Sequence, residues 1–249
     1  EAAEPIHTVK ADEELEQAAE MFKEEERRTA KEAAEKAAAE EEQRRFSAIE
    51  AKMMPLKDKS TGVSFDPKLD DRLYLVGVGV RKKAIINIYA VAAYSSPSAM
   101  EAISSFPRGK QKKEAQMALQ NAARTFDAST PTTSFVLEMV FKADAQTIAG
   151  AIAESVRPRY DGPAADVKDL EALIIKGVKS KGGQATKGTL FRFDCSREGV
   201  SVSVDGMMQG MAKFTGMGSA FVDVFLDKKA VSQQLIDSCL STWCGSDLK

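Results

Sequence analysis

The strongest hydrophobic pattern in the chain covers Leu73–Tyr94. Its first half is apolar or glycine on both faces, which is typical of a buried strand, and the alternating Gly77 and Gly79 indicate that something packs close to the backbone. Arg81–Lys83 predicts a basic turn. The uncharged, Ile- and Val-rich run Ala84–Tyr94 then predicts a second core strand, so that the two strands form a hairpin.

After this hairpin, helical and strand-like patterns follow one another in groups. Apolar residues three or four apart predict helices, and alternating or continuous apolar runs predict strands. The predicted helices are 98–104, 111–126, 145–156, 166–178 and 232–243, and the predicted strands are 134–141, 189–193 and 200–204. Strands clustered as hairpins with helices between them indicate an α+β fold, an antiparallel sheet with helices packed on it.

The first 56 residues have a different pattern. From about residue 11 to 51 they consist largely of Ala, Glu, Lys and Arg without Gly or Pro, which favours a long solvent-exposed α-helix. Large apolar residues occur only near its two ends, so the repeated a and d positions of a coiled coil are missing. We predict a charged, Ala/Glu-rich helical arm over 1–56, either solvated on its own or lying along a protein partner.

Residues 57–67 combine Pro, Gly, Ser, Asp and Lys, which predicts a linker before a globular domain over 68–249. Charge divides the chain in the same way, because 1–56 holds 16 acidic and 9 basic residues and 57–249 holds 21 acidic and 26 basic. The body has no basic stripe interleaved with aromatics, so we expect no nucleic-acid binding. No run approaches the roughly 18 consecutive apolar residues of a transmembrane segment.

The numbers of histidines and cysteines limit the kinds of catalytic and metal site that the chain can form. His7 is the only histidine, so the body holds no Ser-His-Asp or Cys-His arrangement, and we expect no metal site and no cofactor. Three cysteines without a Cys-x-x-Cys spacing predict free thiols, with a Cys239–Cys244 disulfide as the alternative. A start at Glu1 without a Met fits a mature form that has lost a targeting peptide, and equally a trimmed chain.

Several motifs, in order, resemble the chalcone-isomerase superfamily over roughly 62–240. Gly77-Val78-Gly79-Val80-Arg81 resembles the Gly-x-Gly-x-Arg element of its first core hairpin, and Tyr89-Ala90-Val91-Ala92-Ala93-Tyr94 resembles the end of the following strand. In the closing region, the resemblance implies a helix over 211–221 and a short strand from Val222 before Val231-Ser232. It implies an open-faced β-sandwich in which a long sheet and several helices enclose an elongated apolar cleft.

The resemblance also implies a ligand site at Arg81 and Tyr89. In the non-catalytic fatty-acid-binding members of the superfamily, the matching Arg and Tyr bind the carboxylate. A guanidinium keeps its charge and presents a planar fork to a carboxylate, and each buried CH₂ of an apolar tail contributes about 0.8 kcal/mol. From spacing alone, the alternative is that Arg81 is a solvated turn residue and Tyr89 an ordinary core tyrosine.

Two further groups are candidate lining residues of the cleft. One is the glycine pair Gly77 and Gly79. The other is Met207, Met208 and Met211 in a Gly- and Met-rich run, because methionines pack adaptably against lipid. A mobile core segment is the alternative for this run.

An active chalcone isomerase is disfavoured by the residues present. Such enzymes use a Thr at the position that matches Tyr89, together with a Tyr and an Asn on a following helix. Here no tyrosine lies between Tyr94 and Tyr160, and Asn121 stands in roughly the right helix without its partner. The donors that would stabilise an oxyanion are largely missing, so we expect no catalytic residues.

We therefore predict a non-catalytic chalcone-isomerase-like protein that binds a fatty acid by its carboxylate in an apolar cleft. We expect it in an organelle, as a plastid stromal or thylakoid-associated protein. The alternative is an accessory subunit of an organellar membrane-protein complex, docked through the arm. An active isomerase is the third interpretation.

Overall fold

The computed structural model describes residues 20–21, 23–37, 40–41, 44, 47, 53–70, 72–104, 111–126 and 132–243. The chain divides into two compact units, Glu1–Met53 and Met54–Lys249. The predictions on His7, on Cys244 and on the apolar ends of the arm near residues 15, 22, 46 and 49 lie outside the described residues. In the described part, no helix combines the length and the apolar character needed to cross a membrane.

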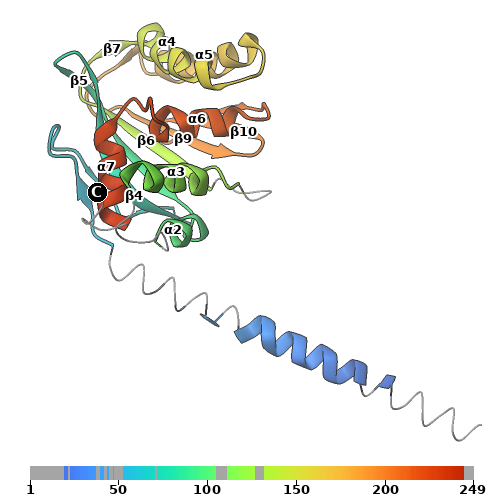
Figure 1. Ribbon diagram of the computed structural model, residues 1–249. Coiled ribbons are helices and arrows are strands. Elements are labelled where there is room, and N and C mark those ends of the chain that lie inside the picture. The colour runs from blue at the N-terminus through green and yellow to red at the C-terminus, as the bar shows by residue number, and fades with distance from the viewer. Residues whose placement is uncertain are drawn as a thin grey trace, which may run out of the picture. The chain divides into compact units, whose positions relative to one another are not determined.

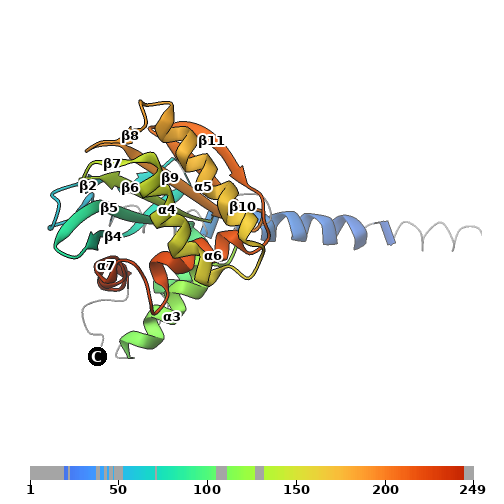
Figure 2. The ribbon, with the colours of Figure 1, turned by 90° about the horizontal axis from the view of Figure 1, so that it is seen from above.

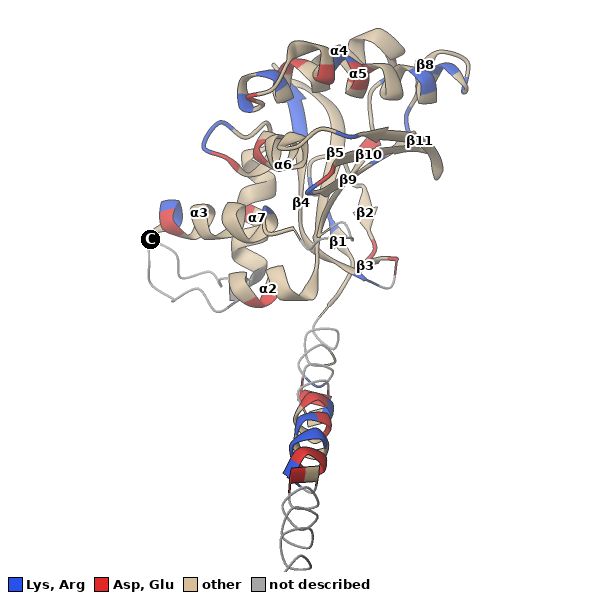
Figure 3. Ribbon diagram, turned by 90° about the vertical axis from the view of Figure 1, so that its right-hand side faces the viewer, with Lys and Arg blue, Asp and Glu red and all other residues tan. Residues whose placement is uncertain are grey.

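In the first unit, residues 23–37 are helical and exposed. Figure 3 shows acidic and basic residues mixed along this helix. Arg28 contacts Glu25 at 2.9 Å and Glu32 at 3.9 Å, and all three side chains are more than 60% exposed. Such exposed pairs contribute little each, so helix propensity is the main local cause of this helix.

The second unit is built on a seven-stranded antiparallel sheet in the order β11-β10-β9-β6-β5-β4-β3 (Figure 1). Its strands are β3 (Lys68–Leu69), β4 (Leu73–Lys83), β5 (Ile86–Ser95), β6 (Thr133–Met139), β9 (Leu190–Ser196), β10 (Gly199–Val204) and β11 (Met207–Ala212). Two short antiparallel pairs accompany it: the hairpin of β1 (Leu56–Lys57) with β2 (Ser64–Phe65), and the pair of β7 (Ala143–Asp144) with β8 (Gln184–Ala185), which residues 145–183 separate in the chain.

Helices cover one face of the sheet. They are α2 (Pro97–Ser104), α3 (Lys112–Ala123), α4 (Ala145–Val156), α5 (Ala164–Lys179), α6 (Met217–Leu226) and α7 (Gln233–Trp243), with a 3₁₀ turn η1 (Arg157–Arg159) after α4. Figures 1 and 2 show α3, α6 and α7 on the same side of the sheet, and α5 packs on β10 and β11. The predicted α+β class is therefore confirmed.

Aromatic side chains fix α6 on the centre of the sheet. Phe135 of β6 and Phe193 of β9 are register partners, so they lie side by side on one face. The Phe135 ring is 4.5 Å from that of Phe225, and the Phe193 ring is 4.6 Å from that of Phe221, both on α6. All four are fully buried, and burying rings of this size supplies much of the packing free energy of a core.

On the opposite face of the sheet, the β1–β2 hairpin packs against the β4–β5 part. Val63 and Phe65 join a buried cluster with Leu75, Val78 and Ala92 of β4 and β5. Residues 57–67, which the sequence predicted as a linker, therefore carry a packed hairpin within the second compact unit. The turn-forming residues form the tip of this hairpin, where Asp58 accepts hydrogen bonds from Thr61 N and Oγ1 at 2.8 and 2.6 Å.

Two local predictions were wrong. The basic residues Arg81–Lys83 continue β4 rather than forming the turn, which consists of Ala84 and Ile85, because the hairpin end is exposed enough for charges to lie in a strand. In the closing region, residues 207–212 form β11 and the helix runs over Met217–Leu226, so no strand begins at Val222. The apolar run that suggested a strand is a helix buried on nearly all sides.

Candidate ligand-binding cavity

The β4–β5 pairing brings Arg81 and Tyr89 together. The two residues lie directly opposite each other in the register, and in an antiparallel pair such partners project from the same face of the sheet. The register then shifts, because Lys82 pairs with Asn87 and leaves Ile88 as an extra residue. Such a bulge re-aims side chains, and it allows the neighbours Ile88 and Tyr89 both to line one cavity.

The glycines of β4 determine where this cavity begins. A Cβ built on Gly77 would lie 2.6 Å from Cys239 N, and one on Gly79 would lie 2.4 Å from Leu235 N. The backbone of α7 therefore rests directly on the strand at these two positions. Gly77 and Gly79 do not line the cavity, contrary to our prediction, since the group that needs their missing side chains is a helix.

Arg81 stands just beyond the start of α7. Its Nη1 donates to the carbonyl of Val231 at 3.4 Å, and Ser232 caps the helix by accepting from Leu235 N at 3.3 Å. Further out along β4 and β5, the hairpin borders a cavity of about 640 Å³. This volume lies within the roughly 300–1,000 Å³ typical of small-molecule sites.

The cavity has a mostly apolar wall on each side. The hairpin contributes Ile86 and Ile88 beside Arg81, Tyr89 and Lys83, and helix α4 faces them with Thr147, Ile148, Ala151 and Ile152. The segment Phe141–Asp144 and Gln184 of β8 complete the lining. Helix α4 begins here because Asp144 is its N-cap, accepting from Thr147 N at 2.9 Å and from Thr147 Oγ1 at 2.6 Å.

The polar groups of this cavity are unevenly paired. Asp144, the one carboxylate of the lining, is engaged with Thr147, and this hydrogen bonding lowers its pKa. Among the described residues, none accepts a hydrogen bond from the Tyr89 hydroxyl, and no carboxylate lies within ion-pairing distance of Arg81. Burial raises the pKa of Tyr89 far above its ordinary value although the nearby charge of Arg81 lowers it. Tyr89 is thus a neutral hydrogen-bond donor. It lies beside the Arg81 guanidinium, which makes one long hydrogen bond, to Val231 O at 3.4 Å.

The three methionines are not part of this cavity. They lie on β11, the edge strand of the sheet, from which β5 is separated by β10, β9 and β6. Met207 and Met208 are exposed and Met211 is half-buried. The prediction that they line the cleft was wrong, because the Gly-Met composition that suggested a lipid-facing wall belongs to a sheet edge.

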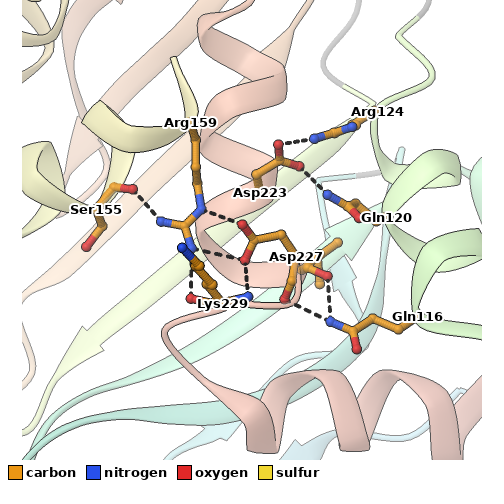
Figure 4. Close-up of polar contacts among 9 residues, drawn as sticks. Gln116, Gln120, Arg124, Ser155, Arg159, Asp223, Asp227 and Lys229 are labelled. Carbon is orange, nitrogen blue, oxygen red and sulfur yellow. Dashed lines mark hydrogen bonds and ion pairs between the residues drawn. The ribbon is translucent and has the colours of Figure 1, made fainter. Parts of the chain in front are cut away.

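A second, polar cavity of about 380 Å³ lies near α6 and η1. Arg159 lines it, and Figure 4 shows this side chain surrounded by acceptors. Its Nε and Nη2 bind the two carboxylate oxygens of Asp227 at 2.9 and 3.0 Å, and its Nη1 binds Ser155 O at 2.6 Å. Nearby, Arg124 forms an ion pair with Asp223, which also accepts from Gln120 Nε2 at 2.7 Å.

The structure places the two predicted residues, Arg81 and Tyr89, at one cavity, and their role as ligand-binding residues stays a prediction. The sequence did not indicate the opposite wall. Ile148 and Ile152 are buried on α4, within the predicted helix 145–156, but nothing local in the sequence indicates which part of the buried face borders a cavity. Phe141 was predicted as the last residue of a strand, but the observed strand β6 ends at Met139. The place of Phe141 and Lys142 on the rim depends on the short β7–β8 pair, whose two-residue strands carry no detectable periodicity.

The sequence matches neither a protein-family model nor a curated protein. Among solved structures, the protein is similar to the fatty-acid binding protein AtFAP1 of Arabidopsis thaliana. The TM-score is 0.58 and the identity 17%, and the match covers 77% of this chain and 100% of the other. Together with the curled antiparallel sheet and its one-sided helix layer, this match shows that the protein has the chalcone-isomerase-like fold predicted from its motifs.

Proposed function

We propose that the protein is a non-catalytic binder of a fatty acid, or of a similar apolar carboxylate, in the cavity at Arg81 and Tyr89. The proposal rests mainly on the hydrogen bonds and ion pairs that Arg81 and Tyr89 lack within the described part of the protein. A guanidinium and a buried phenol face one largely apolar cavity, and no described carboxylate neutralises the guanidinium. The structural match to a fatty-acid binding protein supports the same conclusion.

The energetics favour such a ligand. Keeping a charge beside an apolar cavity is costly unless a counter-charge or a hydrogen-bond partner is present. A carboxylate meets both needs, since it can accept two parallel hydrogen bonds from Arg81 and a further one from Tyr89. The aliphatic tail would lie between Ile88 and the α4 wall, where each buried CH₂ contributes about 0.8 kcal/mol.

The same lining argues against catalysis. Asn121, the residue that matched the isomerase pattern, is exposed on α3 and does not line the cavity. Tyr89, with its raised pKa, stays protonated near neutral pH and is suited to donating a hydrogen bond rather than to exchanging a proton. The residues present therefore fit binding and orientation of a ligand.

The test is a comparison of a carboxylic acid with a matched alcohol. The delipidated full-length chain would be titrated with lauric acid and with dodecanol, by displacement of a fluorescent fatty acid. Arg81→Gln is expected to weaken the acid by about 10- to 100-fold, as for loss of charge-assisted hydrogen bonds, and to leave the alcohol nearly unchanged.

Arg157→Gln is the matched control, because Arg157 is an exposed arginine of η1 outside the cavity, and it should bind lauric acid like the unmodified protein. Equal affinity for acid and alcohol in the unmodified protein would refute carboxylate recognition. Equal loss of both ligands in Arg81→Gln would refute the role given to the guanidinium.

Docking of the arm on a protein partner and a plastid location stay predictions. The exposed, charged helix at 23–37 is compatible with either an arm in solvent or a docked arm. Cross-linking at an arm residue such as Lys31, in an extract of the native organelle, would distinguish them.

A further inference from the structure

The tip of the β4–β5 hairpin is unusually apolar for a tight turn. Its two loop residues are Ala84 and Ile85, and the Ile85 side chain is 95% exposed. Ala84 has φ of +52°, and a positive φ at the first loop position is where two-residue turns favour glycine. The chain thus exposes a large aliphatic side chain and accepts a strained residue at a site where Gly or Asn would relieve the strain.

This tip forms one rim of the cavity. Ile86, next to the turn, is 45% exposed and lines the cavity, and Phe141, on the other side of the opening, is 46% exposed. Figure 1 shows the end of the β4–β5 hairpin near β7, which begins two residues after Phe141. Of the nine large apolar side chains that are exposed in the described part of the chain, Ile85, Ile86 and Phe141 are gathered at this rim.

Basic residues flank these apolar side chains. Lys82 and Lys83 precede the turn and Lys142 follows Phe141, and all three are exposed. The carboxylate of the lining, Asp144, is held by Thr147 as a helix cap. Exposed apolar side chains flanked by lysines fit the surface of a bilayer that contains anionic lipids. There the apolar groups insert and the lysines bind headgroup phosphates.

We propose that the hairpin tip, defined as Lys82–Ile86 with Phe141 and Lys142, docks on an anionic lipid bilayer. The tip surrounds the mouth of the apolar cavity, so docking places that mouth at the membrane surface. The passage of a fatty acid between membrane and cavity rests on the proposed function. The docking itself rests only on the exposure and charge of the tip.

The experiment is co-sedimentation of the full-length chain with vesicles, either of phosphatidylcholine alone or of phosphatidylcholine and phosphatidylglycerol in about a 7:3 ratio. The protein should sediment with the anionic vesicles and much less with the neutral ones. Ile85→Asp should lower the partition coefficient by about tenfold or more, and so should raising the salt from about 0.1 to 0.5 M, because salt screens the lysines.

Met207→Asp is the matched control. Met207 is also an exposed apolar residue, at 56%, but it lies on the edge strand β11 away from the cavity. The control should sediment like the unmodified protein. Thermal unfolding of both variants checks that they fold, which is expected because neither side chain is in the core.

Failure of the docking and failure of ligand binding are distinguishable. In vesicle-free buffer, Ile85→Asp should bind lauric acid normally, and Arg81→Gln should lose lauric acid but still sediment with anionic vesicles. Unmodified protein that stays in the supernatant with both vesicle types overturns the docking and leaves the ligand titration to judge the cavity. Equal losses in Ile85→Asp and Met207→Asp would also overturn it.

Discussion

Two cavities in the described part of the chain contain an arginine and a tyrosine each, but these differ in their hydrogen-bond partners. The polar cavity has Arg159 and Tyr160, and the apolar cavity has Arg81 and Tyr89. Arg159 binds both oxygens of Asp227, and the Tyr160 hydroxyl donates to Asp166 at 2.5 Å. Arg81 reaches a single backbone carbonyl, and Tyr89 has no acceptor among the described residues. An arginine in a cavity therefore indicates a ligand site only where its hydrogen bonds within the protein leave donors available.

The difference assigns separate tasks to the two arginines. Arg159 also donates to the carbonyl of Lys229 at 2.7 Å, while Gln116 Nε2 donates to the carbonyl of Asp227 at 2.8 Å. These bonds hold the connection between α6 and α7, which presents Val231 O to Arg81. The polar cavity thus holds the chain that borders the apolar one. Arg124 Nε, in the polar cavity, also has no hydrogen-bond partner among the described residues, so the contrast is between Arg159 with Tyr160 and Arg81 with Tyr89.

The largest expected effect is on stability and comes from breaking the ion pair of Arg159 with Asp227. Arg159→Gln should lower the free energy of unfolding by about 3–5 kcal/mol, because it leaves the carboxylate of Asp227 without its partner. The side chains of Arg159 and Asp227 are only 10% and 19% exposed, so water replaces the partner poorly. Chemical denaturation measures the change.

The control for this variant is Arg157→Gln on the same 3₁₀ turn, which should stay within about 0.5 kcal/mol of the unmodified protein, as is usual for exposed sites. Below the denaturation range, the folded fraction of Arg159→Gln should bind lauric acid within about threefold of normal. A loss of affinity with unchanged stability would show that the roles of the two arginines are the reverse of those argued above.

The next effect concerns pH and the unpaired phenol. Burial, partly offset by the charge of Arg81, raises the pKa of Tyr89 above its ordinary value. Above about pH 10 an unfolded tyrosine loses its proton while folded Tyr89 keeps it, so the unfolded state is favoured and stability falls as pH rises. Each such tyrosine contributes a slope of up to about 1.4 kcal/mol per pH unit.

Tyr89→Phe should therefore show a shallower decline of unfolding free energy between about pH 10 and 11.5, by up to that slope. Buried Tyr94, whose pKa is also raised, donates to Asp66 O at 3.0 Å and provides a second tyrosine for comparison. If the slopes of Tyr89→Phe and the unmodified protein coincide, Tyr89 is accessible to water and ionises freely.

The sequence predicted the parts of the site that lie on one hairpin. The glycine alternation correctly indicated a close approach to β4, but whether a helix or a ligand approaches Gly77 and Gly79 depends on α7, more than 150 residues later in the chain. The sequence analysis placed Arg81 in a turn, so the register that sets it opposite Tyr89 is a finding of the structure. The motif resemblance was needed to choose them over the solvated-turn alternative.

The other half of the cavity depends on long-range packing. The α4 wall and Phe141 come from chain more than 50 residues beyond Arg81, and the bulge at Ile88 leaves no pattern in a run as uniformly apolar as 84–94. The methionine run was misassigned because composition does not distinguish a sheet edge from a cavity wall. The distribution of buried and exposed positions on β11 could be known only once its neighbours β10 and α5 were in place.

The smallest expected effect is on ligand affinity, and it compares Tyr89 with Tyr160. Tyr89→Phe should weaken lauric acid by about 1 kcal/mol, or roughly fivefold, because one hydrogen bond to the ligand is lost. The stability of the ligand-free protein should be nearly unchanged or slightly higher, because the Tyr89 hydroxyl has no hydrogen-bond partner among the described residues that the substitution would remove. Tyr160→Phe should do the opposite. Burial, together with the hydrogen bond to Asp166, raises the pKa of Tyr160 to about 12. Because Tyr160→Phe removes the donor to Asp166, it should lower stability and leave lauric acid binding as it was. If the two substitutions have the same effects, the difference in pairing between the cavities does not determine which of them binds the ligand.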